Sequence, residues 1–227
     1  MIALVVTFAA VVAAKSSSDS EKVALEGAEV GKWTMDYEAA RQLAEEKDLP
    51  MLLNFTGSDW CGWCQLMDEK VFAEEEWKKY ASEHAVLVTL DFPKDEGIVP
   101  EKYVARNQKL REKFGVGGYP TYVILDSDGE TKLGQLGASR DAEPASFIND
   151  FKRVVQLSEG SIADYVEKNP GKAEDFKKAV AEYREATNEL EDWIKTRPER
   201  NDENVKKFET FRERISAAES KLGEFLQ

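Results

Sequence analysis

Short runs of apolar and β-branched residues alternate with helical patterns over the first two thirds of this chain. Three runs have the length and composition of buried strands, at 51–56, 85–90 and 119–125. Helical patterns lie at 36–48, 60–70, 73–83, 100–114 and 142–158. After the third run, Asp126-Ser-Asp-Gly129 predicts a hairpin turn with a returning strand over 130–136. Strands that first alternate with helices and then form a hairpin predict an α/β fold, with a mixed β-sheet flanked by helices.

The last part of the chain has a different pattern. No strand-like run occurs in residues 159–227, and apolar residues recur at steps of three and four over 176–194 and again over 205–225. Because this spacing gives each stretch one apolar helical face, and Pro198 lies between them, the region predicts an antiparallel α-helical hairpin. The two faces either bury only each other or make the hairpin a spacer, a dimerisation arm or a substrate-docking arm.

The N-terminus indicates export. Residues 1–14 are apolar apart from Thr7, and a polar stretch begins at Lys15. Fourteen residues would rise about 21 Å as a helix, too little to cross a bilayer, but the length and the small residues at 12–14 fit a signal peptide. No basic residue precedes the run, so an uncleaved apolar tail stays an alternative. We expect a flexible lead-in over 15–32 and a periplasmic or secreted protein without a stable membrane anchor after cleavage.

Charge and rare residues exclude several kinds of site. Acidic residues outnumber basic ones by 44 to 31, which gives a net charge of -13. Such a surface repels phosphate backbones, so we expect no nucleic-acid partner. The chain has one histidine, His84, and two cysteines, Cys61 and Cys64. A histidine-rich metal site or a four-cysteine zinc site cannot be built from this set, and we expect no metal centre.

The candidate reactive site is Cys61-Gly-Trp-Cys64. Such a pair can be half of a zinc site, a haem attachment, a copper site, a structural disulfide or a redox pair. Zinc would need two further ligands, and haem would need a histidine where Gln65 stands. A disulfide closing so short a loop removes little entropy from the unfolded chain. The redox pair is favoured, and copper(I) on two thiolates stays an alternative.

The position of the pair supports redox chemistry. Cys61 lies where a predicted strand gives way to a helix, whose unpaired N–H groups and dipole stabilise a thiolate. Cys64 follows one turn later on the same face. We therefore predict that Cys61 attacks a substrate disulfide and that Cys64, more buried and with the higher pKa, resolves the mixed disulfide.

Two motifs carry a family resemblance. Trp60-Cys-Gly-Trp-Cys64 after a short strand, with Tyr119-Pro-Thr121 opening a later strand, resembles the thioredoxin superfamily over residues 33–158. Phe55-Thr-Gly-Ser-Asp-Trp-Cys-Gly-Trp-Cys64 is similar to exported bacterial thioredoxin-like, disulfide-isomerase-like proteins. The resemblance implies a thioredoxin fold, with a cis-proline at Pro120 that faces the cysteines. It also implies that the backbone of Tyr119 pairs with an extended substrate segment.

The sequence departs from the family at two places. The position matching the family's buried aspartate, the proton acceptor for the second cysteine, is Asn54 here, and Asp59 suggests a route through solvent instead. Trp63 stands between the cysteines, where family members have proline or histidine. Without a cation beside Cys61, we expect a less oxidising pair that acts as a reductase or isomerase.

These observations predict an exported thiol–disulfide oxidoreductase acting on protein disulfides. Cys61 and Cys64 are its predicted catalytic residues, and Trp60, Trp63, Tyr119 and Pro120 its predicted substrate-binding residues. Its expected partners are disulfide-containing exported proteins and a redox partner that reduces or oxidises the pair, and no bound cofactor is needed. The alternative is a non-catalytic adaptor or chaperone that binds partners through the helical hairpin and the apolar rim.

Overall fold

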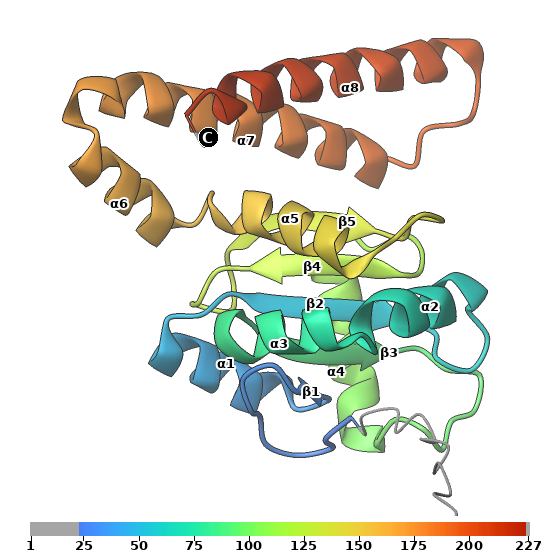
Figure 1. The fold of residues 1–227 in the computed structure, drawn as a ribbon. Helices are drawn as coiled ribbons and strands as arrows, with labels where there is room; N and C mark the ends of the chain where they lie inside the picture. The colour runs from blue at the N-terminus through green and yellow to red at the C-terminus, as the bar shows by residue number, and fades with distance from the viewer. Residues whose placement is uncertain (1–22, 226–227) are drawn as a thin grey trace, which may run out of the picture.

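The computed structural model describes residues 23–225, which form a mixed five-stranded sheet with the order β1-β3-β2-β4-β5 (Figure 1). The first three strands in this order are parallel, whereas β4 runs antiparallel to β2 and β5 runs antiparallel to β4. The strands are β1 (Trp33–Thr34), β2 (Met51–Thr56), β3 (Val86–Asp91), β4 (Thr121–Leu125) and β5 (Lys132–Gly137). The predicted α/β fold and its closing hairpin are confirmed.

Both faces of the central strand β2 are buried, and each face packs on a different set of helices. Met51, Leu53 and Phe55 pack with helices α1 (Tyr37–Lys47) and α4 (Glu101–Lys113). Leu52 faces the other side, which is covered by α2 (Gly62–Met67), the π-helical turn η1 (Asp68–Phe72), α3 (Glu75–His84) and α5 (Pro144–Val155). Because helices cover both faces of the sheet, the strands are continuous apolar runs in the sequence.

Aromatic rings fix the helix that carries the cysteines against the sheet. The ring of Phe72, at the end of η1, lies with its centroid 5.2 Å from those of Tyr122 and Phe147. Trp77 of α3 lies 5.3 Å from both Phe72 and Phe147. Edge-to-face pairs of this kind add stability beyond the area that they bury. They set the position of α2 over the carboxyl ends of the parallel strands.

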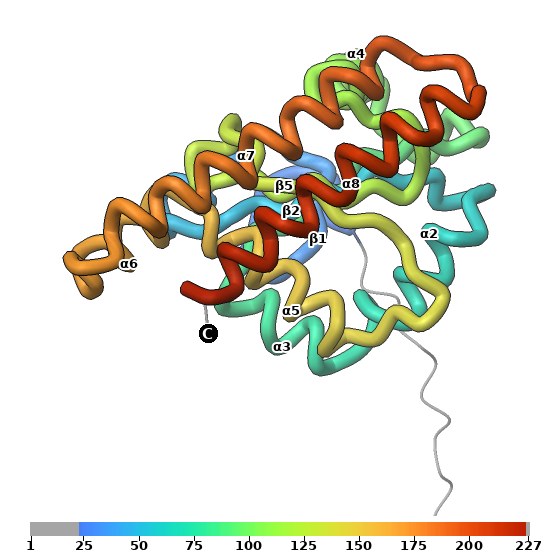
Figure 2. The backbone as a smooth tube through the Cα atoms, turned by 90° about the horizontal axis from the view of Figure 1, so that it is seen from above, coloured from blue at the N-terminus to red at the C-terminus, as the bar shows by residue number. Residues whose placement is uncertain are grey.

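The C-terminal region is helical, as predicted, but it has more parts than the expected hairpin. α7 (Ala173–Lys195) and α8 (Asp202–Gly223) form the antiparallel pair, and both lie along the β5 edge of the sheet (Figures 1 and 2). Helix α6 (Glu159–Lys168) and a 3-10 turn, η2 (Pro170–Lys172), precede them. The side chain of Ser158 caps α6 by accepting from the N–H of Ser161, a local start signal that the apolar spacing alone does not reveal.

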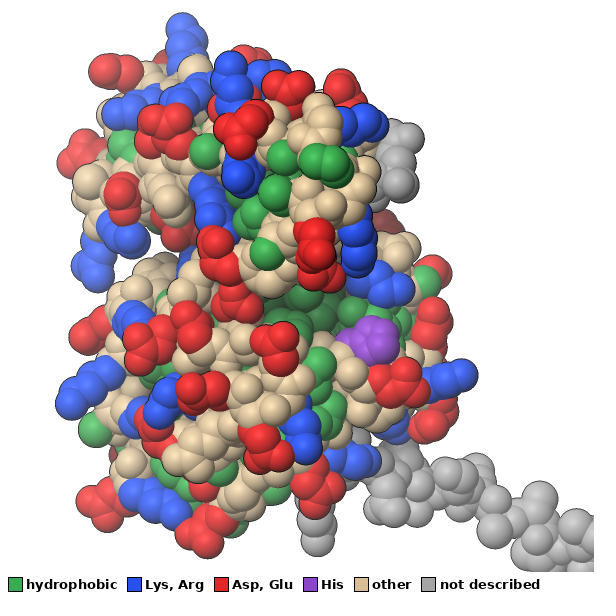
Figure 3. All heavy atoms as spheres, turned by 90° about the vertical axis from the view of Figure 1, so that its left-hand side faces the viewer, with side chains coloured by type: hydrophobic (Ala, Val, Ile, Leu, Met, Phe, Trp, Pro, Cys, Tyr) green, Lys and Arg blue, Asp and Glu red, His purple; other side chains and the backbone are tan. Residues whose placement is uncertain are grey.

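Polar contacts tie the hairpin to the sheet domain. Lys132 of β5 pairs with Glu191 of α7 at 2.6 Å, and Arg184 of α7 donates to the carbonyl of Leu157 at 2.7 Å. Between the two parts lies a groove of about 590 Å³ whose apolar wall includes Leu136 and Leu222, visible as a hollow in Figure 3. The hairpin therefore lies beside the edge strand β5 and contacts it through Lys132.

The expected flexible lead-in over 15–32 is wrong for residues 23–32. Ala24 bridges to Thr34, and Val30 bridges to Val86. The Thr34 hydroxyl also donates to the carbonyl of Gly27 at 2.6 Å. These contacts order a segment whose composition alone indicates a loop. The segment leads into β1, which has only two residues and therefore shows no apolar pattern in the sequence. The predicted signal peptide at 1–14 lies outside the described residues.

Candidate active site

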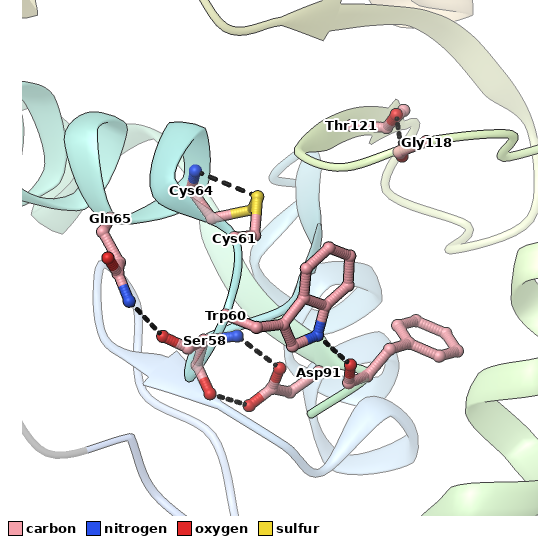
Figure 4. The surroundings of a disulfide bond; sticks show 9 residues. Ser58, Trp60, Cys61, Cys64, Gln65, Asp91, Gly118 and Thr121 are labelled. Carbon is pink, nitrogen blue, oxygen red and sulfur yellow. Dashed lines mark hydrogen bonds between the residues drawn. A yellow bond between two sulfur atoms is a disulfide. The ribbon is translucent and has the colours of Figure 1, made fainter. Parts of the chain in front are cut away.

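The two cysteines form a disulfide at the start of α2 (Figure 4). Cys61 is the N-cap residue of the helix, and Cys64 lies one turn later, with 5.2 Å between the Cα atoms. The backbone N–H of Cys64 donates to Sγ of Cys61 at 3.2 Å. The predicted position of the pair, between a strand and a helix, is therefore observed.

The two cysteines differ in their exposure to solvent. Cys61 is 6% exposed and Cys64 is 1% exposed, so Cys64 is the more buried residue, as predicted. Gly62 and Trp63, which separate them, are exposed. Cys61 is therefore the more accessible cysteine for an incoming disulfide.

Three side-chain contacts hold the loop before the disulfide. The carboxylate of Asp91, at the end of β3, accepts from the N–H of Ser58 at 3.0 Å and from its hydroxyl at 2.5 Å. The side-chain amide of Gln65 donates to the carbonyl of Ser58 at 3.0 Å. The indole N–H of Trp60 donates to the carbonyl of Phe92 at 2.9 Å. Sequence reasoning missed Ser58 and Asp91, although Asp91 ends a strand in register with the last residue of β2.

The peptide bond between Tyr119 and Pro120 is cis, as the resemblance implied. Pro120 is buried, Tyr119 is half-buried, and the ring of Tyr119 lies 5.8 Å from that of Trp60. Trp60 and Trp63 are each 43% exposed. The guanidinium of Arg140 lies 5.7 Å from the ring of Trp63. Large aromatic surfaces are thus open to solvent beside the disulfide.

A groove of about 730 Å³ begins at these aromatic side chains and extends to α4. Trp60, Phe92 and Tyr119 form one wall, and Val104 of α4 contributes an exposed apolar side chain to the other. The guanidinium of Arg111 lies 5.8 Å from the ring of Phe92 and 5.6 Å from that of Tyr119. The groove is large enough for substrate side chains close to the reacting sulfur.

Polar residues line the face of the sheet beneath α2. Asn54 lies opposite Thr89 of β3 and Tyr122 of β4, and Thr56 lies opposite Asp91. All five are buried. Among the described residues, Asn54 Oδ1, Thr56 Oγ1 and the Tyr122 hydroxyl have no hydrogen-bond partner. Buried polar atoms without partners are uncommon and require an explanation.

Two carboxyl groups near the disulfide have shifted pKa values. Slight burial of Asp59 is outweighed by hydrogen bonds from the N–H groups of Lys94 and Asp95, which hold the pKa of its carboxyl below the ordinary value. These bonds direct Asp59 toward the loop after β3. Asp68, where α2 passes into η1, behaves differently. Burial, followed by the negative charge of Asp91, raises the pKa of Asp68 to about 6.

Comparisons with known proteins define the family. The sequence profile of a thioredoxin-like family matches residues 32–127. Disulfide bond reductase DsbH from Chlamydia pneumoniae is 31% identical over 121 residues, which cover 53% of this chain and 71% of that protein. The chain belongs to the thioredoxin superfamily.

Two further matches agree with this assignment. Thioredoxin-related protein DsbJ from Chlamydia pneumoniae is 30% identical over 106 residues, which cover 47% of this chain and 30% of DsbJ. A solved structure of a DsbH oxidoreductase matches with a TM-score of 0.51 at 30% identity, covering 58% of this chain and 88% of that chain. With its Cys61–Cys64 pair at the start of α2, this thioredoxin-superfamily protein is a thiol–disulfide oxidoreductase.

Over residues 23–225, no group of three or more His, Cys, Asp or Glu side chains is placed to hold a metal ion. Within the same range, none of the helices combines the length and apolarity that crossing a bilayer requires.

Proposed function

We propose that the protein is an exported reductase of protein disulfides. Cys61 attacks a substrate disulfide and forms a mixed disulfide, and Cys64 then attacks Cys61 to release the reduced substrate. The observation that carries the proposal is the asymmetry of the pair, in which the more exposed Cys61 accepts a hydrogen bond from the N–H of Cys64. The relative DsbH is named as a disulfide bond reductase, which agrees with this direction of electron flow.

The surroundings of the two sulfurs favour a cysteine pair that reduces its substrates over one that strongly oxidises them. Among the described residues, the hydrogen bond to Cys61 Sγ comes from a backbone N–H, and no side-chain cation hydrogen-bonds to either sulfur. Strong oxidants of this chemistry owe their potential to a stabilised reduced form. With less stabilisation of its thiolate, this pair gives up electrons more readily. We expect a reduction potential nearer to about -270 mV than to about -120 mV.

The substrate is expected to bind across the aromatic surface beside the disulfide. The backbone of Tyr119, before the cis-proline Pro120, pairs with an extended substrate segment as an added strand. Trp60 and Trp63 contact apolar side chains near the substrate cysteine. The groove leading to α4 accepts a further side chain of the same segment.

An insulin-reduction assay on the full chain, with dithiothreitol as electron donor, tests the activity. We expect turnover for the wild type and none above background for Cys61→Ser. Cys64→Ser should accumulate mixed disulfides with client proteins, because the resolving step is lost. Equal rates for the wild type and Cys61→Ser would reject the proposal.

The second candidate is an adaptor or chaperone, and one feature of the hairpin favours it. Ile194, Val205 and Phe208 are exposed where α7 ends and α8 begins. Exposed apolar residues that gather in one place can bind a partner. If Cys61→Ser suppressed the aggregation of an unfolded protein as well as the wild type does, while Ile194→Ser with Phe208→Ser did not, binding through the hairpin would be the main function.

Export is part of the proposal. A reductase of disulfides has substrates where disulfides persist, which is outside the cytosol. The apolar N-terminal residues 1–14 support secretion. Fractionation of cells that produce the full chain, with N-terminal sequencing of the recovered protein, checks both the compartment and the cleavage. Recovery of uncleaved protein from the cytosol would contradict this part of the proposal.

A further inference from the structure

The apolar spacing of the helical hairpin continues beyond the part of the hairpin that is buried. The buried residues of α7 lie between Ala173 and Ala186, and those of α8 are Ala218 and Leu222. Because the two helices are antiparallel, all of these residues lie in the same half of the hairpin. Over 187–217 neither helix has a buried residue. Core packing therefore explains the apolar face in one half of the hairpin and leaves it unexplained in the other.

Exposed apolar side chains gather at the end of this second half. Ile194, Val205 and Phe208, which we term the hairpin-end patch, are 47%, 43% and 38% exposed. The rings of Phe208 and Phe211 lie 6.4 Å and 5.6 Å from the ring of Trp193. These ring contacts join the end of α7 to the start of α8, so the patch is one surface built by both helices.

The hairpin-end patch lies at the same end of the molecule as the disulfide. Figures 1 and 2 both show the connection between α7 and α8 at the right, where α2 also lies. The side chain of Lys195, next to Ile194, lies 3.6 Å from the position that a Cβ at Gly115 would occupy. Gly115 belongs to the loop that leads to Tyr119 and the cis-proline Pro120. One short loop therefore connects the patch to the proposed substrate-binding surface.

This loop is open to solvent, and it is short enough for one substrate segment to cross. Residues 117–118 are exposed glycines, and a Cβ at either would meet no atom within 4 Å. Tyr119 follows Gly115 by four residues, so their Cα atoms lie at most about 14 Å apart. With the contact between the loop and the end of α7 added, Ile194 lies within roughly 25 Å of Tyr119, the span of about eight extended residues.

Exposed apolar residues are concentrated around this path. Over residues 23–225, seven large apolar side chains are exposed, and one of them, Leu25, lies on the segment before β1. The other six border the disulfide, line the groove beside it or form the hairpin-end patch: Trp60, Trp63, Val104, Ile194, Val205 and Phe208. Apolar side chains that gather on one exposed surface mark a binding site. The patch therefore continues the apolar surface that begins at the reacting sulfurs.

A polypeptide substrate fits the hairpin-end patch better than a second copy of the chain does. Its three side chains offer on the order of a few hundred Å², against about 800 Å² per partner in a stable interface. A surface of this size gives a weak and reversible contact, which suits a substrate that leaves after each reaction. Unfolded polypeptides expose the apolar side chains that such a contact needs, whereas folded proteins bury most of them.

We propose that the hairpin-end patch is a second substrate-binding site, which holds an apolar segment of a non-native polypeptide about eight residues from the cysteine that Cys61 attacks; this inference rests on the proposed function. Binding at the patch raises the effective concentration of the substrate disulfide beside Cys61. The hairpin thereby makes the enzyme selective for unfolded polypeptides over small disulfides and folded proteins.

Matched peptides test the proposal with the full-length reduced protein. Each peptide carries one cysteine in a mixed disulfide with thionitrobenzoate, which is released as a coloured thiol when Cys61 attacks the peptide sulfur. One peptide has two leucines about eight residues from the cysteine, and the other has two serines there. We expect the second-order rate constant of the wild type to be about tenfold higher for the leucine peptide. Ile194→Ser with Phe208→Ser should bring this ratio close to 1.

Two controls separate the patch from other effects. Leu25→Ser replaces the exposed apolar residue on the segment before β1 and should keep the wild-type ratio. A third peptide with its leucines two residues from the cysteine is too short to reach the patch, so its rate relative to the serine peptide should be the same in the wild type and the double variant.

Equal wild-type rates for the serine peptide and the eight-residue leucine peptide would overturn the inference, and this comparison decides even if the double variant fails to fold. A ratio that the double variant leaves unchanged would overturn it as well. If sedimentation showed a dimer that the double variant converts to a monomer with an unchanged ratio, the patch would belong to a second copy of the chain instead. Release from none of the peptides by the wild type would contradict the proposed function itself.

Discussion

The backbone N–H of Cys64 donates to the sulfur of Cys61 across 3.2 Å, within the first turn of α2. In the reduced protein the same donor is placed to stabilise a thiolate at Cys61 and gives none of this stabilisation to Cys64. The helix dipole acts in the same direction, because its positive end lies at Cys61. The two cysteines, three residues apart, are therefore chemically unequal.

This inequality predicts the order of alkylation. In the reduced protein at neutral pH, we expect iodoacetamide to modify Cys61 at least about tenfold faster than Cys64, because Cys61 has more thiolate and more exposure. Mass spectrometry of peptides from a timed reaction measures both rates. The urea-unfolded chain is the control, and there the two rates should be similar. Faster modification of Cys64 in the folded protein would contradict the assignment of the nucleophile.

Much of the fold could be predicted because its elements have strong local patterns. The strands β2, β3 and β4 are apolar runs buried on both faces, and α7 and α8 carry regular apolar spacing. The two-residue strand β1 and the order of residues 23–32 depend instead on pairing with β3, a partner far away in the sequence. Helix α6 has no fully buried residue, and its short apolar face of Ile162, Tyr165 and Val166 is only partly buried.

The site, too, could be predicted only where a local sequence motif defines it. Cys61, Cys64 and the cis bond before Pro120 follow from short motifs with a fixed structural meaning. The contact between Ser58 and Asp91 joins residues 33 positions apart, and no local pattern predicts it. The pKa of Asp68 depends on its burial in the folded protein and on the charge of Asp91, at the end of β3. Asp59 shows the reverse case, in which proximity in sequence suggested a role that its backbone contacts do not support.

Gly27 and Gly31 have the same φ angle, so substitutions at these two positions can distinguish backbone strain from steric conflict. Gly27 and Gly31 both have φ of 75°. A Cβ at Gly27 would meet no atom within 4 Å, whereas a Cβ at Gly31 would lie 2.4 Å from Cα of Ser82. We expect Gly27→Ala to lower the free energy of unfolding by about 1–2 kcal/mol, from backbone strain alone. Gly31→Ala should cost about 1–3 kcal/mol more, because α3 must move. Urea unfolding of both variants measures this difference, and equal losses would contradict it.

The groove beside the disulfide predicts a substrate-dependent effect at α4. Val104 is exposed and lines the groove with Trp60 and Tyr119. We expect Val104→Glu to lower kcat/KM for a protein disulfide by about tenfold, equivalent to about 1.4 kcal/mol of binding, and to leave the reaction with Ellman's reagent unchanged. Leu25→Glu, at an exposed apolar residue outside the groove, is the control and should change neither. If Val104→Glu slowed both substrates alike, its effect would lie at the sulfurs rather than in the groove.

The raised pKa of Asp68 also predicts a stability that depends on pH. Its pKa is about 6 in the folded protein, above the ordinary value of 3.8, so the folded state binds this proton more tightly than the unfolded state does. The contribution of Asp68 to stability is therefore fully present below about pH 4 and is lost as the pH rises through 6. Asp68→Asn should match the wild-type melting temperature at pH 4 and exceed it at pH 7, because the amide removes the cost of the charge. Glu69→Gln, at an exposed acid next to Asp68, is the control and should give the same small difference at both pH values. A variant Asp68→Asn that melts below the wild type at pH 7 would mean that the charge stabilises the fold.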